Sequence, residues 1–479
     1  MTQSSKFDIA IIGAGAGGLV VAAVAAQLGH KVVLFEKHKM GGDCLNYGCV
    51  PTKSLIAATK ALYNIKEAHK FGVFTYNAEL DFQRMKRHVQ YVIDSIAPHD
   101  STERFEGLGV TVVKGTAKFI NKNTILVDGN EYKAKRFVIA TGSHPFIPPI
   151  KGIDTVPHLT NETILELDEC PKHLVVVGGG PIGCEMAQNY NRMGARVTII
   201  EATSGILLKE EPKIAKMLAE QFSKEGIQVF TSSHIVDIWQ TNGETQIKLN
   251  INGAEKKISC SHILLATGRK ANTEHLGLKK AGVTYTNQNI VVDKSMRTTN
   301  KAIYAIGDVA GPYQFTHMAG YQASIVISRM LFGNIFAKAN YNAVPWCTYT
   351  DPELAHVGLT EEQARAKYKD KHIRCITLPF KNTDRAKAER KTRGMIKVVF
   401  GKKGRILGAT IFGHLAGEII QQWAILITHK MSAKHLLKVI LPYPTFSEIN
   451  KHVASEYYKD VFYSKRTGKI SRFLFKYFG

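Results

Sequence analysis

The sequence predicts an α/β protein of about three domains, and three observations carry this prediction. The chain has 479 residues, of which 44% are hydrophobic, enough for several cores in domains of roughly 100–200 residues each. It contains 40 glycines but 15 prolines, as expected where many tight turns join strands to helices. A pattern of strand, glycine-rich turn, helix and strand occurs twice, and its turns begin 165 residues apart, at Gly13 and Gly178.

The two copies of this pattern agree element by element. An apolar strand, 7–12 in the first copy and 173–177 in the second, leads into the turn and a helix. A second apolar strand, at 31–35 and at 196–200, ends at an acidic residue. The defining residues are Gly13, Gly15, Gly18 and Glu36 in the first copy, and Gly178, Gly180, Gly183 and Glu201 in the second. This order of elements is typical of a Rossmann-like dinucleotide-binding unit.

Each position in the pattern has a physical role. The first glycine makes the tight turn, the second lets the backbone approach a pyrophosphate, and the third lets the helix pack on the strand. The helix N-terminus presents unpaired N–H groups to the phosphates, and the acid accepts hydrogen bonds from a ribose. A glycine-rich turn without a ligand is the alternative, and two complete copies argue against it. Because the Glu201 carboxylate suits a free 2′-hydroxyl and repels a 2′-phosphate, we expect the second copy to prefer NADH to NADPH.

Three further apolar strands, at 137–140, 263–266 and 302–306, end at turns that we expect to contribute to cofactor binding. The residues at these turns are Thr141 and Gly142, Gly268, and Asp308. Taken alone, Asp308 would be a turn or helix-cap aspartate.

Cys44 and Cys49 stand five residues apart, shortly after the first glycine-rich unit and where the sequence predicts the start of a helix. A helix N-terminus and a nearby lysine, here Lys53, both favour thiolate over thiol. A dithiol beside a flavin passes two electrons between a nicotinamide and a sulfur, metal or quinone substrate. The alternatives are a structural disulfide or half of a zinc site. No second Cys/His pair stands nearby at ligand spacing, and we predict no metal site.

The remaining cysteines and the N-terminus bear on the compartment. Seven cysteines in 479 residues indicate a reducing environment rather than a disulfide scaffold. The other five are expected to behave as small apolar residues; they are Cys170, Cys184, Cys260, Cys347 and Cys375. The polar first residues lack the pattern of a signal peptide, and no stretch approaches about 20 continuous apolar residues. We therefore expect a cytoplasmic protein.

Together, these motifs resemble the class I pyridine nucleotide–disulfide oxidoreductases over roughly residues 6–455. The resemblance implies an FAD-binding domain formed by 1–150 and 291–340, and an NAD(P)-binding domain at 151–290. It further implies an α+β dimerisation domain at 341–460, and a homodimer whose active site is shared between subunits. Residues 461–479 form a basic amphipathic tail beyond these domains.

The resemblance also implies roles for individual residues. The first glycine-rich unit and Glu36 would hold the ADP half of FAD, and Asp308 would hold its ribityl–phosphate region. The second glycine-rich unit would hold NADH. Cys49 would lie against the flavin, and Cys44 would meet a small-molecule electron acceptor. Lys53 would lie near the reactive flavin edge, paired with Glu185.

The chain departs from the best-known members near its C-terminus. Dihydrolipoamide dehydrogenase and glutathione reductase carry His-Pro-Thr followed by Ser-Glu, and the His, oriented by the Glu, acts as acid–base for the interchange thiol. Here Tyr443 takes the His position and Glu448 remains. A phenol titrates near pH 10 and an imidazole near about 6.5, so Tyr443 is a poor general base. His452 is expected to be a surface helix residue, and we expect inefficient exchange with dithiols such as lipoamide.

These features leave the electron acceptor open. Mercuric reductase also has Tyr at the His position, but it carries a C-terminal cysteine pair, and this chain has no cysteine after Cys375. The main expectation is an FAD-dependent enzyme that passes electrons from NAD(P)H through the dithiol to an unidentified acceptor. The alternatives are Hg(II) reduction, dihydrolipoamide oxidation, or, in a different class, a scaffold that keeps the fold and binds lipid or nucleic acid.

The charge and the tail suggest a surface partner. Lys and Arg number 63 against 40 Asp and Glu, a net charge of +23, which attracts acidic substrates, anionic lipid or nucleic acid. No nucleic-acid module is recognisable, so we expect no specific nucleic acid. Apolar residues repeat along one helix face of the tail; they are Ile470, Phe473, Leu474, Tyr477 and Phe478. This pattern is typical of a helix lying on an anionic membrane, here the inner face, or of one docked on the protein's own surface.

Overall fold

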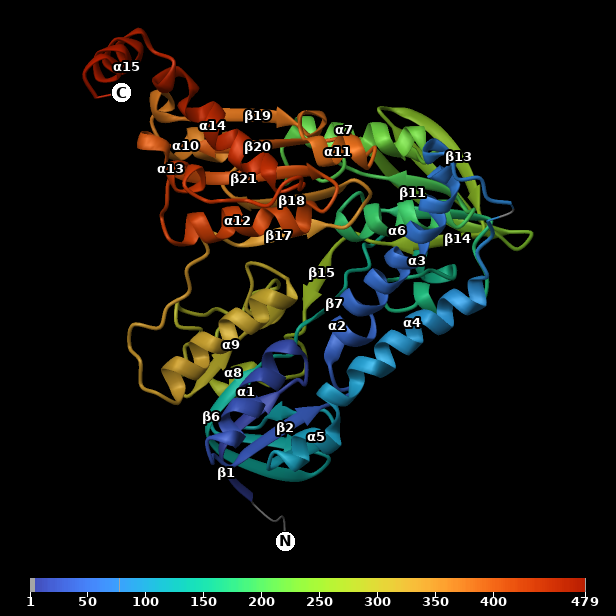
Figure 1. Cartoon of the computed structure of the whole chain (residues 1–479). Coiled ribbons are helices and arrows are strands. Elements are labelled where there is room, and N and C mark those ends of the chain that lie inside the picture. Colours follow the sequence, from blue (N-terminus) through green and yellow to red (C-terminus); the bar gives the residue numbers. More distant parts are fainter. Residues whose placement is uncertain (1–4, 77, 479) are drawn as a thin grey trace. The chain divides into compact units, whose positions relative to one another are not determined.

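The computed structural model describes residues 5–76 and 78–478. Their contacts define two compact units, shown in Figure 1. The first comprises Met1–Ala202 and Gly226–Asn340, and the second Thr203–Glu225 and Tyr341–Gly479. The mixture of parallel and antiparallel sheets with covering helices confirms the predicted α/β class.

The first unit is built around a sheet with the strand order β3-β2-β1-β6-β5-β4, to which β16 adds beside β6. Its strands are β1 (Ser5–Ile12), β2 (Val32–Glu36), β3 (Val110–Lys114), β4 (Lys118–Phe119), β5 (Thr124–Val127), β6 (Asn130–Ile139) and β16 (Ile303–Ala305). The strands β1, β2, β3, β6 and β16 are paired in parallel. Apolar side chains such as Ile12, Phe35 and Ile139 form one buried core of this sheet, as expected for parallel strands covered on both faces.

Helices cover this sheet and carry the cysteine segment. They are α1 (Ala16–Gln27), α2 (Gly42–Asn46), α3 (Cys49–Glu67), α4 (Phe82–Ile96), α5 (Thr102–Gly107), α8 (Leu278–Ala281) and α9 (Thr316–Met330). Helix α1 packs on α9, and α3 runs beside α4 (Figure 1). The predicted helix after the first glycine-rich turn is therefore confirmed as α1, and the one after the cysteines as α3.

The second glycine-rich unit forms its own parallel sheet with the order β10-β9-β8-β14. These strands are β8 (His173–Val177), β9 (Arg196–Ile200), β10 (Gln228–Phe230) and β14 (His262–Leu265), with α6 (Pro181–Arg192) after the turn. An antiparallel sheet of β11 (Ser233–Thr241), β12 (Glu244–Ile251) and β13 (Ala254–Cys260) shares a buried core with it. The short strands β7 (Ser143–Pro145) and β15 (Arg269–Ala271) pair antiparallel where the chain leaves and re-enters the first sheet's region.

The second unit has a five-stranded antiparallel sheet with the order β17-β18-β21-β20-β19. Its strands are β17 (Pro345–Thr348), β18 (Glu353–Gly358), β19 (Arg374–Pro379), β20 (Met395–Phe400) and β21 (Ile406–Gly413). Its helices are α7 (Pro212–Lys224), α10 (Glu361–Lys367), α11 (Asp384–Ala388), α12 (Ala416–Thr428), α13 (Lys434–Leu437), α14 (Glu448–Phe462) and α15 (Lys465–Phe478). Trp423 on α12 is fully buried in the core and donates a hydrogen bond from Nε1 to Asn450 Oδ1 on α14, 2.8 Å away.

The predicted tail helix is α15, the last helix in Figure 1. None of its described residues is buried, and Phe473 and Tyr477 on its apolar face are each 60% exposed. Within the described residues, no helix combines the length and the apolar character needed to cross a membrane.

Candidate active site

The two glycine-rich turns have the same backbone geometry. Gly13 and Gly178 have φ angles of 103° and 109°, a region that strains any residue with a side chain. Their N–H groups donate to the carbonyl oxygens of Phe35 and Ile200, each 2.8 Å away. The turn of each copy is thus tied to the end of that copy's second strand, as the duplicated sequence pattern predicts.

The third glycine of each turn allows the helix to approach the strand closely. A Cβ added at Gly18 would lie 2.0 Å from the carbonyl oxygen of Gly13, and one added at Gly183 would lie 2.0 Å from that of Gly178. No side chain fits at either position without moving the backbone. The packing role predicted for the third glycine therefore holds in both copies.

The acidic residue of each copy turns back toward its glycine-rich turn. Glu36 Oε2 accepts a hydrogen bond from the Ala14 N–H at 2.8 Å, and Glu201 Oε2 accepts one from the Gly179 N–H at 2.7 Å. Each carboxylate is therefore held beside the helix N-terminus, where it can accept hydrogen bonds from ribose hydroxyls.

The space in front of the two helices fits a pyrophosphate. Gly15 and Gly180 are the N-caps of α1 and α6. A Cβ added at Gly15 would meet nothing closer than 4.0 Å, and one at Gly180 nothing within 4 Å. Open space with unpaired helix N–H groups at its base is the arrangement that binds phosphate. The residues present therefore fit two dinucleotides, one at each turn.

The later turns lie against the same two sites. A Cβ on Gly13 would lie 2.4 Å from the Ala140 carbonyl oxygen, just before Thr141 and Gly142. The corresponding contact of Gly178 is to Ala266, just before Thr267 and Gly268. Gly142 and Gly268 both have positive φ, 68° and 121°. The structure therefore brings these predicted residues together with the glycine-rich turns.

Cys44 and Cys49 lie on two helices that follow one another in the chain. Cys44 is within α2, and Cys49 is the first residue of the 19-residue helix α3. Both are free thiols here. Cys49 Sγ also lies 3.3 Å from the hydroxyl oxygen of Thr316, the first residue of α9. The N-termini of two long helices therefore meet at this sulfur.

The two thiols differ sharply in acidity. A hydrogen bond from Cys44, with the Thr316 hydroxyl and the charge of Lys53, lowers the pKa of Cys49 from 9.0 to about 6, against the opposing effects of burial and Asp43. The same hydrogen bond between the two thiols, together with burial, raises the pKa of Cys44. At neutral pH, Cys49 is thus the thiolate and Cys44 the thiol.

Lys53 and Glu185 form the ion pair that the resemblance implied. Lys53 Nζ lies 2.8 Å from Glu185 Oε2, and the Glu185 side chain is 6% exposed. These residues come from α3 and α6, so the pair joins the dithiol helix to the helix of the second glycine-rich turn. The lysine is thereby held one helical turn from Cys49.

Tyr443 and Glu448 belong to the second unit. The Tyr443 hydroxyl donates a hydrogen bond to Asp384 Oδ2 at 3.1 Å, and this carboxylate raises the pKa of the phenol. Glu448 Oε1 lies 3.5 Å from Nε2 of His452, one turn further along α14. Glu448 therefore faces His452, a partly exposed helix residue, and Tyr443 faces a carboxylate that the sequence did not single out.

Three residues near the dithiol were missed by sequence reasoning. Thr316 follows Cys49 by 267 positions, and no local pattern marks it. Arg269 follows Gly268 directly, and its side chain lies 3.1 Å from Asp43, the residue before Cys44. Arg269 directly follows Gly268, and Asp43 directly precedes Cys44. These neighbouring motif residues were the signal by which both could have been found.

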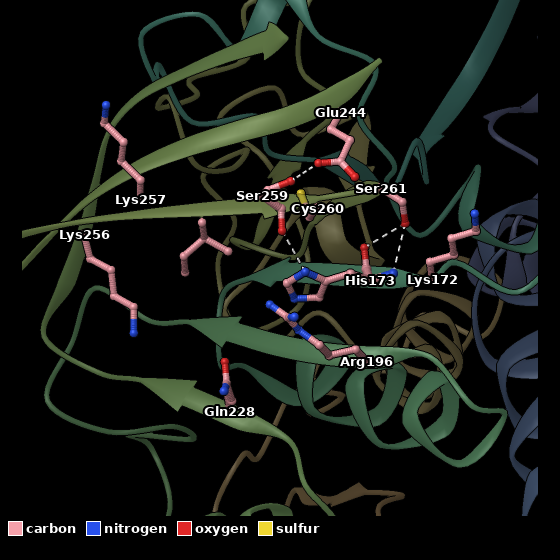
Figure 2. A pocket seen from close by; sticks show the side chains of 11 residues that line it. Lys172, His173, Arg196, Gln228, Glu244, Lys256, Lys257, Ser259, Cys260 and Ser261 are labelled. Carbon is pink, nitrogen blue, oxygen red and sulfur yellow. Dashed lines mark hydrogen bonds between the residues drawn. The ribbon is translucent and has the colours of Figure 1, made fainter. Parts of the chain in front are cut away.

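A separate hollow of about 440 Å³ lies at the amino ends of β8 and β9, beside β13 (Figure 2). Its cationic lining residues are Lys172, Arg196, Lys256 and Lys257. The buried His173 is engaged through both ring nitrogens, with the Ser259 carbonyl oxygen at 2.8 Å and the Thr198 hydroxyl at 2.9 Å. The hollow contains neither the dithiol nor the glycine-rich turns, and we assign it no part in the active site.

Comparison with known proteins identifies the class. The sequence matches the family described as pyridine nucleotide-disulphide oxidoreductase over residues 7–323. It matches the dimerisation domain of this family over residues 344–454. The chain belongs to this family, and the resemblance drawn from its motifs is confirmed. It is therefore an FAD-dependent oxidoreductase that uses NAD(P)H, and the matched dimerisation domain supports a homodimer.

Individual relatives carry two different names. A mercuric reductase of Lysinibacillus sphaericus is 32% identical over 463 residues, covering 96% of this chain and 84% of the relative. A dihydrolipoyl dehydrogenase of Bacillus subtilis (strain 168) is 35% identical over 447 residues, covering 92% and 96%. The HOCl-induced flavoprotein disulfide reductase RclA of Escherichia coli is similar in structure, with a TM-score of 0.84, 30% identity, and coverage of 94% and 99%.

Proposed function

We propose that this enzyme passes two electrons from NADH, through FAD and the Cys44–Cys49 pair, to an acceptor other than a small disulfide. The observation that carries the first half is the thiol pair itself, with Cys49 at the start of α3 and its Sγ 3.3 Å from the hydroxyl oxygen of Thr316, the first residue of α9. Bound FAD supplies the two-electron chemistry between nicotinamide and sulfur. The first glycine-rich turn, Glu36 and Asp308 would hold it, and the second turn would hold NADH.

The protein's own residues prepare the sulfur chemistry. In the reduced pair, Cys49 is held as a thiolate by the Cys44 thiol, the Thr316 hydroxyl and the charge of Lys53. Oxidation breaks the Cys44 S–H bond, releases its proton and forms the Cys44–Cys49 bond, and the acceptor takes up the two electrons. Glu185 keeps the Lys53 ammonium in place. Cys44, which retains its proton, is the thiol that we assign to contact with the acceptor.

The second half of the proposal rests on Tyr443. Its phenol donates to Asp384. A phenol is ordinarily protonated at neutral pH, and the carboxylate raises the pKa of Tyr443 further. Tyr443 is therefore a hydrogen-bond donor rather than a proton acceptor. Glu448, which would orient a histidine at position 443, faces His452 instead. This arrangement supports an acceptor that needs no base at position 443, such as a quinone or a metal ion.

Hg(II) reduction is the second candidate. It is favoured by Tyr443 and by relatives named mercuric reductase, of which one from Shewanella putrefaciens is 36% identical over 482 residues. The sulfur atoms of the Cys44–Cys49 pair, with Cys44 on the acceptor side, are soft ligands that bind a soft metal ion. Dihydrolipoamide oxidation, suggested by the other group of relatives, would need a base that Tyr443 does not supply.

An acceptor screen tests the proposal. NADH oxidation would be followed with lipoamide, oxidised glutathione, Hg(II), quinones and oxygen, using the unaltered enzyme, Cys44→Ser and, as a matched control, Cys170→Ser. We expect a quinone or Hg(II) to be turned over faster than lipoamide or oxidised glutathione. The rate with that acceptor should fall at least tenfold in Cys44→Ser and should not change in Cys170→Ser. Fastest turnover with lipoamide or glutathione would contradict the proposal, as would full activity of Cys44→Ser.

The preference for NADH is proposed from Glu201. Its carboxylate lies at the second glycine-rich turn, where a 2′-phosphate would be repelled. We expect a KM for NADH at least tenfold below that for NADPH, and a smaller ratio in Glu201→Gln. A lower KM for NADPH in the unaltered enzyme would contradict this assignment.

We also propose the limits of the domains of this enzyme and its location in the cell. We assign residues 1–150 and 291–340 to FAD binding, 151–290 to NADH binding, and 341–460 to a homodimer whose active site both subunits share. We further propose that α15 attaches this cytoplasmic enzyme to an anionic membrane surface, because its apolar face is exposed and it carries no acidic residue. Its cations are Lys465, Arg466, Lys469, Arg472 and Lys476.

Vesicle flotation tests the membrane proposal. The full chain and a chain ending at residue 464 would be mixed with vesicles of phosphatidylglycerol and phosphatidylcholine, and with vesicles of phosphatidylcholine alone. We expect the full chain to float with the anionic vesicles and the shortened chain to stay at the bottom of the gradient. Equal flotation of both chains, or flotation of neither, would contradict a role for α15.

A further inference from the structure

One arginine joins helix α2, which carries Cys44, to the strand that follows the second glycine-rich turn. Arg269 opens β15 and its side chain is 11% exposed. Its Nη2 lies 3.1 Å from Asp43 Oδ1, next to Cys44, and its Nε lies 3.9 Å from Asp308 Oδ2. A single nearly buried cation therefore stands between two carboxylates from different parts of the first unit.

Further hydrogen bonds fix the guanidinium in this position. Arg269 Nε donates to the Ser143 hydroxyl at 2.7 Å and Nη2 to the Ser143 carbonyl oxygen at 3.0 Å. Nη1 donates to Asn161 Oδ1 at 3.3 Å. The same Ser143 hydroxyl donates to Asp308 Oδ2 at 2.5 Å. A planar group with five donors suits such a network, and a lysine would satisfy fewer of these partners.

Asp43 brings a negative charge beside the backbone that leads into Cys49, because a Cβ added at Gly48, the residue before Cys49, would lie 2.9 Å from Asp43 Oδ2. Its backbone carbonyl oxygen accepts from the N–H groups of Tyr47 and Gly48, at 2.8 and 2.7 Å, so it is fixed just before Cys49. Its carboxylate raises the pKa of Cys49. The charged and titratable groups that act on Cys49 are Cys44, Lys53 and Asp43. Of these, Asp43 alone has a recorded ion pair with Arg269 among the described residues.

We propose that Arg269 is a positioning residue that holds and neutralises Asp43 beside the Cys44–Cys49 segment, and thereby favours the thiolate form of Cys49. The same side chain also contacts Asp308, so Arg269 links Asp43 to the segment that would hold FAD. This inference rests on the proposed function, because it requires the Cys44–Cys49 pair to be the redox centre. Loss of Arg269 would leave Asp43, the carboxylate that acts on Cys49, without its cation.

The test compares Arg269→Gln, Asp43→Asn and the double variant with the unaltered protein. A thiolate beside an oxidised flavin gives long-wavelength absorbance, and its growth with pH reports the midpoint of Cys49 ionisation. We expect Arg269→Gln to move this midpoint up by about 1 pH unit and Asp43→Asn to move it down. In the double variant the upward shift should disappear, because its source has been removed. Lys270→Gln, which breaks the neighbouring pair with Glu274, is the matched control and should cause no shift.

A second readout does not require a flavin. The rate of iodoacetamide reaction with Cys49, followed by mass spectrometry over a range of pH, should show the same order of midpoints. This arm decides the matter if Arg269→Gln fails to retain FAD. An unmoved midpoint in Arg269→Gln, or an upward shift that persists in the double variant, overturns the proposal.

The two proposals fail in different ways. An unaltered enzyme that binds FAD but shows no long-wavelength absorbance at any pH after two-electron reduction would contradict the proposed redox pair itself. An unaltered enzyme with this absorbance, but with variants that titrate alike, would contradict the role of Arg269 alone.

Discussion

Cys49 shows how one residue type acquires opposite properties within a single chain. Its position at the start of α3, with Lys53 one turn away, favours the thiolate. Cys184 has the same side chain, but it is fully buried, and burial raises its pKa. Electrophiles at neutral pH should therefore react with Cys49 far faster than with Cys184.

Glu210 offers a prediction about stability at the residue scale. Its side chain is buried, Oε1 accepts from Trp346 Nε1 at 2.5 Å, and Oε2 has no hydrogen-bond partner among the residues that the structure describes. Burial raises its pKa from 4.5 to about 7. The folded state thus binds the Glu210 proton more tightly than the unfolded chain does. The stability that this proton binding contributes is complete below about pH 4.5 and is lost as the pH rises through about 7. At pH 8, Glu210→Gln should raise the free energy of unfolding by about 2–3 kcal/mol.

Urea unfolding at pH 5 and pH 8 checks this expectation, and the adjacent residue supplies the control. Glu211 Oε2 lies 2.6 Å from Lys397 Nζ, and its Oε1 accepts from the Glu361 N–H at 2.8 Å. Glu211→Gln should therefore lower stability at pH 8, in the opposite direction. A loss of stability in Glu210→Gln at pH 8 would show that its carboxylate is ionised and satisfied.

Sequence reasoning reached the residues that belong to local motifs. Cys44, Cys49 and Lys53 share one 13-residue segment, and the Lys53–Glu185 pair followed from the resemblance. Thr316 and Asp384 could not be found this way. Their contacts, to Cys49 and to Tyr443, join segments 267 and 59 residues apart, and a threonine or an aspartate at the start of a helix is too common to mark a site.

At the scale of elements, the duplicated turns make a matched pair of variants possible. A Cβ at Gly18 or at Gly183 meets a backbone oxygen at 2.0 Å, so each alanine variant should push its helix away from its turn. Gly18→Ala should lose most of its FAD, seen as loss of yellow colour. Gly183→Ala should keep FAD and raise the KM for NADH at least tenfold.

Gly107, a glycine outside both turns, provides the control for this pair of variants. Gly107 ends α5, and a Cβ there would meet nothing within 4 Å, so Gly107→Ala should retain both FAD and NADH affinity. Loss of FAD from Gly183→Ala with normal FAD in Gly18→Ala would reverse the assignment of the two turns.

The sequence predicted the parallel sheets more directly than the antiparallel one. Strands β1 and β8 are apolar runs before glycine-rich turns, a pattern with a clear physical meaning. The resemblance alone predicted the second compact unit, and only as an α+β dimerisation domain; the order β17-β18-β21-β20-β19 was not predicted. Helix α7 belongs by its contacts to the second unit, and the pairs that hold its segment, such as Glu211 with Lys397, span nearly two hundred residues. Such long-range partners leave no periodic trace in the sequence.

At the scale of the whole molecule, the net charge of +23 should act on the rate of encounter with charged acceptors. A positive field raises the association rate of anions and is screened by salt. With NADH saturating, kcat/KM for ferricyanide should fall at least threefold between about 20 and 200 mM NaCl. The value for neutral benzoquinone should stay within a factor of about two. Equal salt dependence for both acceptors would contradict electrostatic steering.

The unequal protonation of the two thiols also has a thermodynamic consequence. With Cys49 ionised above about pH 6 and Cys44 still protonated, reduction of the pair takes up two electrons but a single proton. The midpoint potential of the pair should then fall by about 30 mV per pH unit, half the slope of an ordinary dithiol. The nicotinamide couple exchanges the same two electrons and one proton. The driving force from NADH to the dithiol should therefore be nearly independent of pH across the neutral range, and redox titrations between pH 6.5 and 8.5 would measure it.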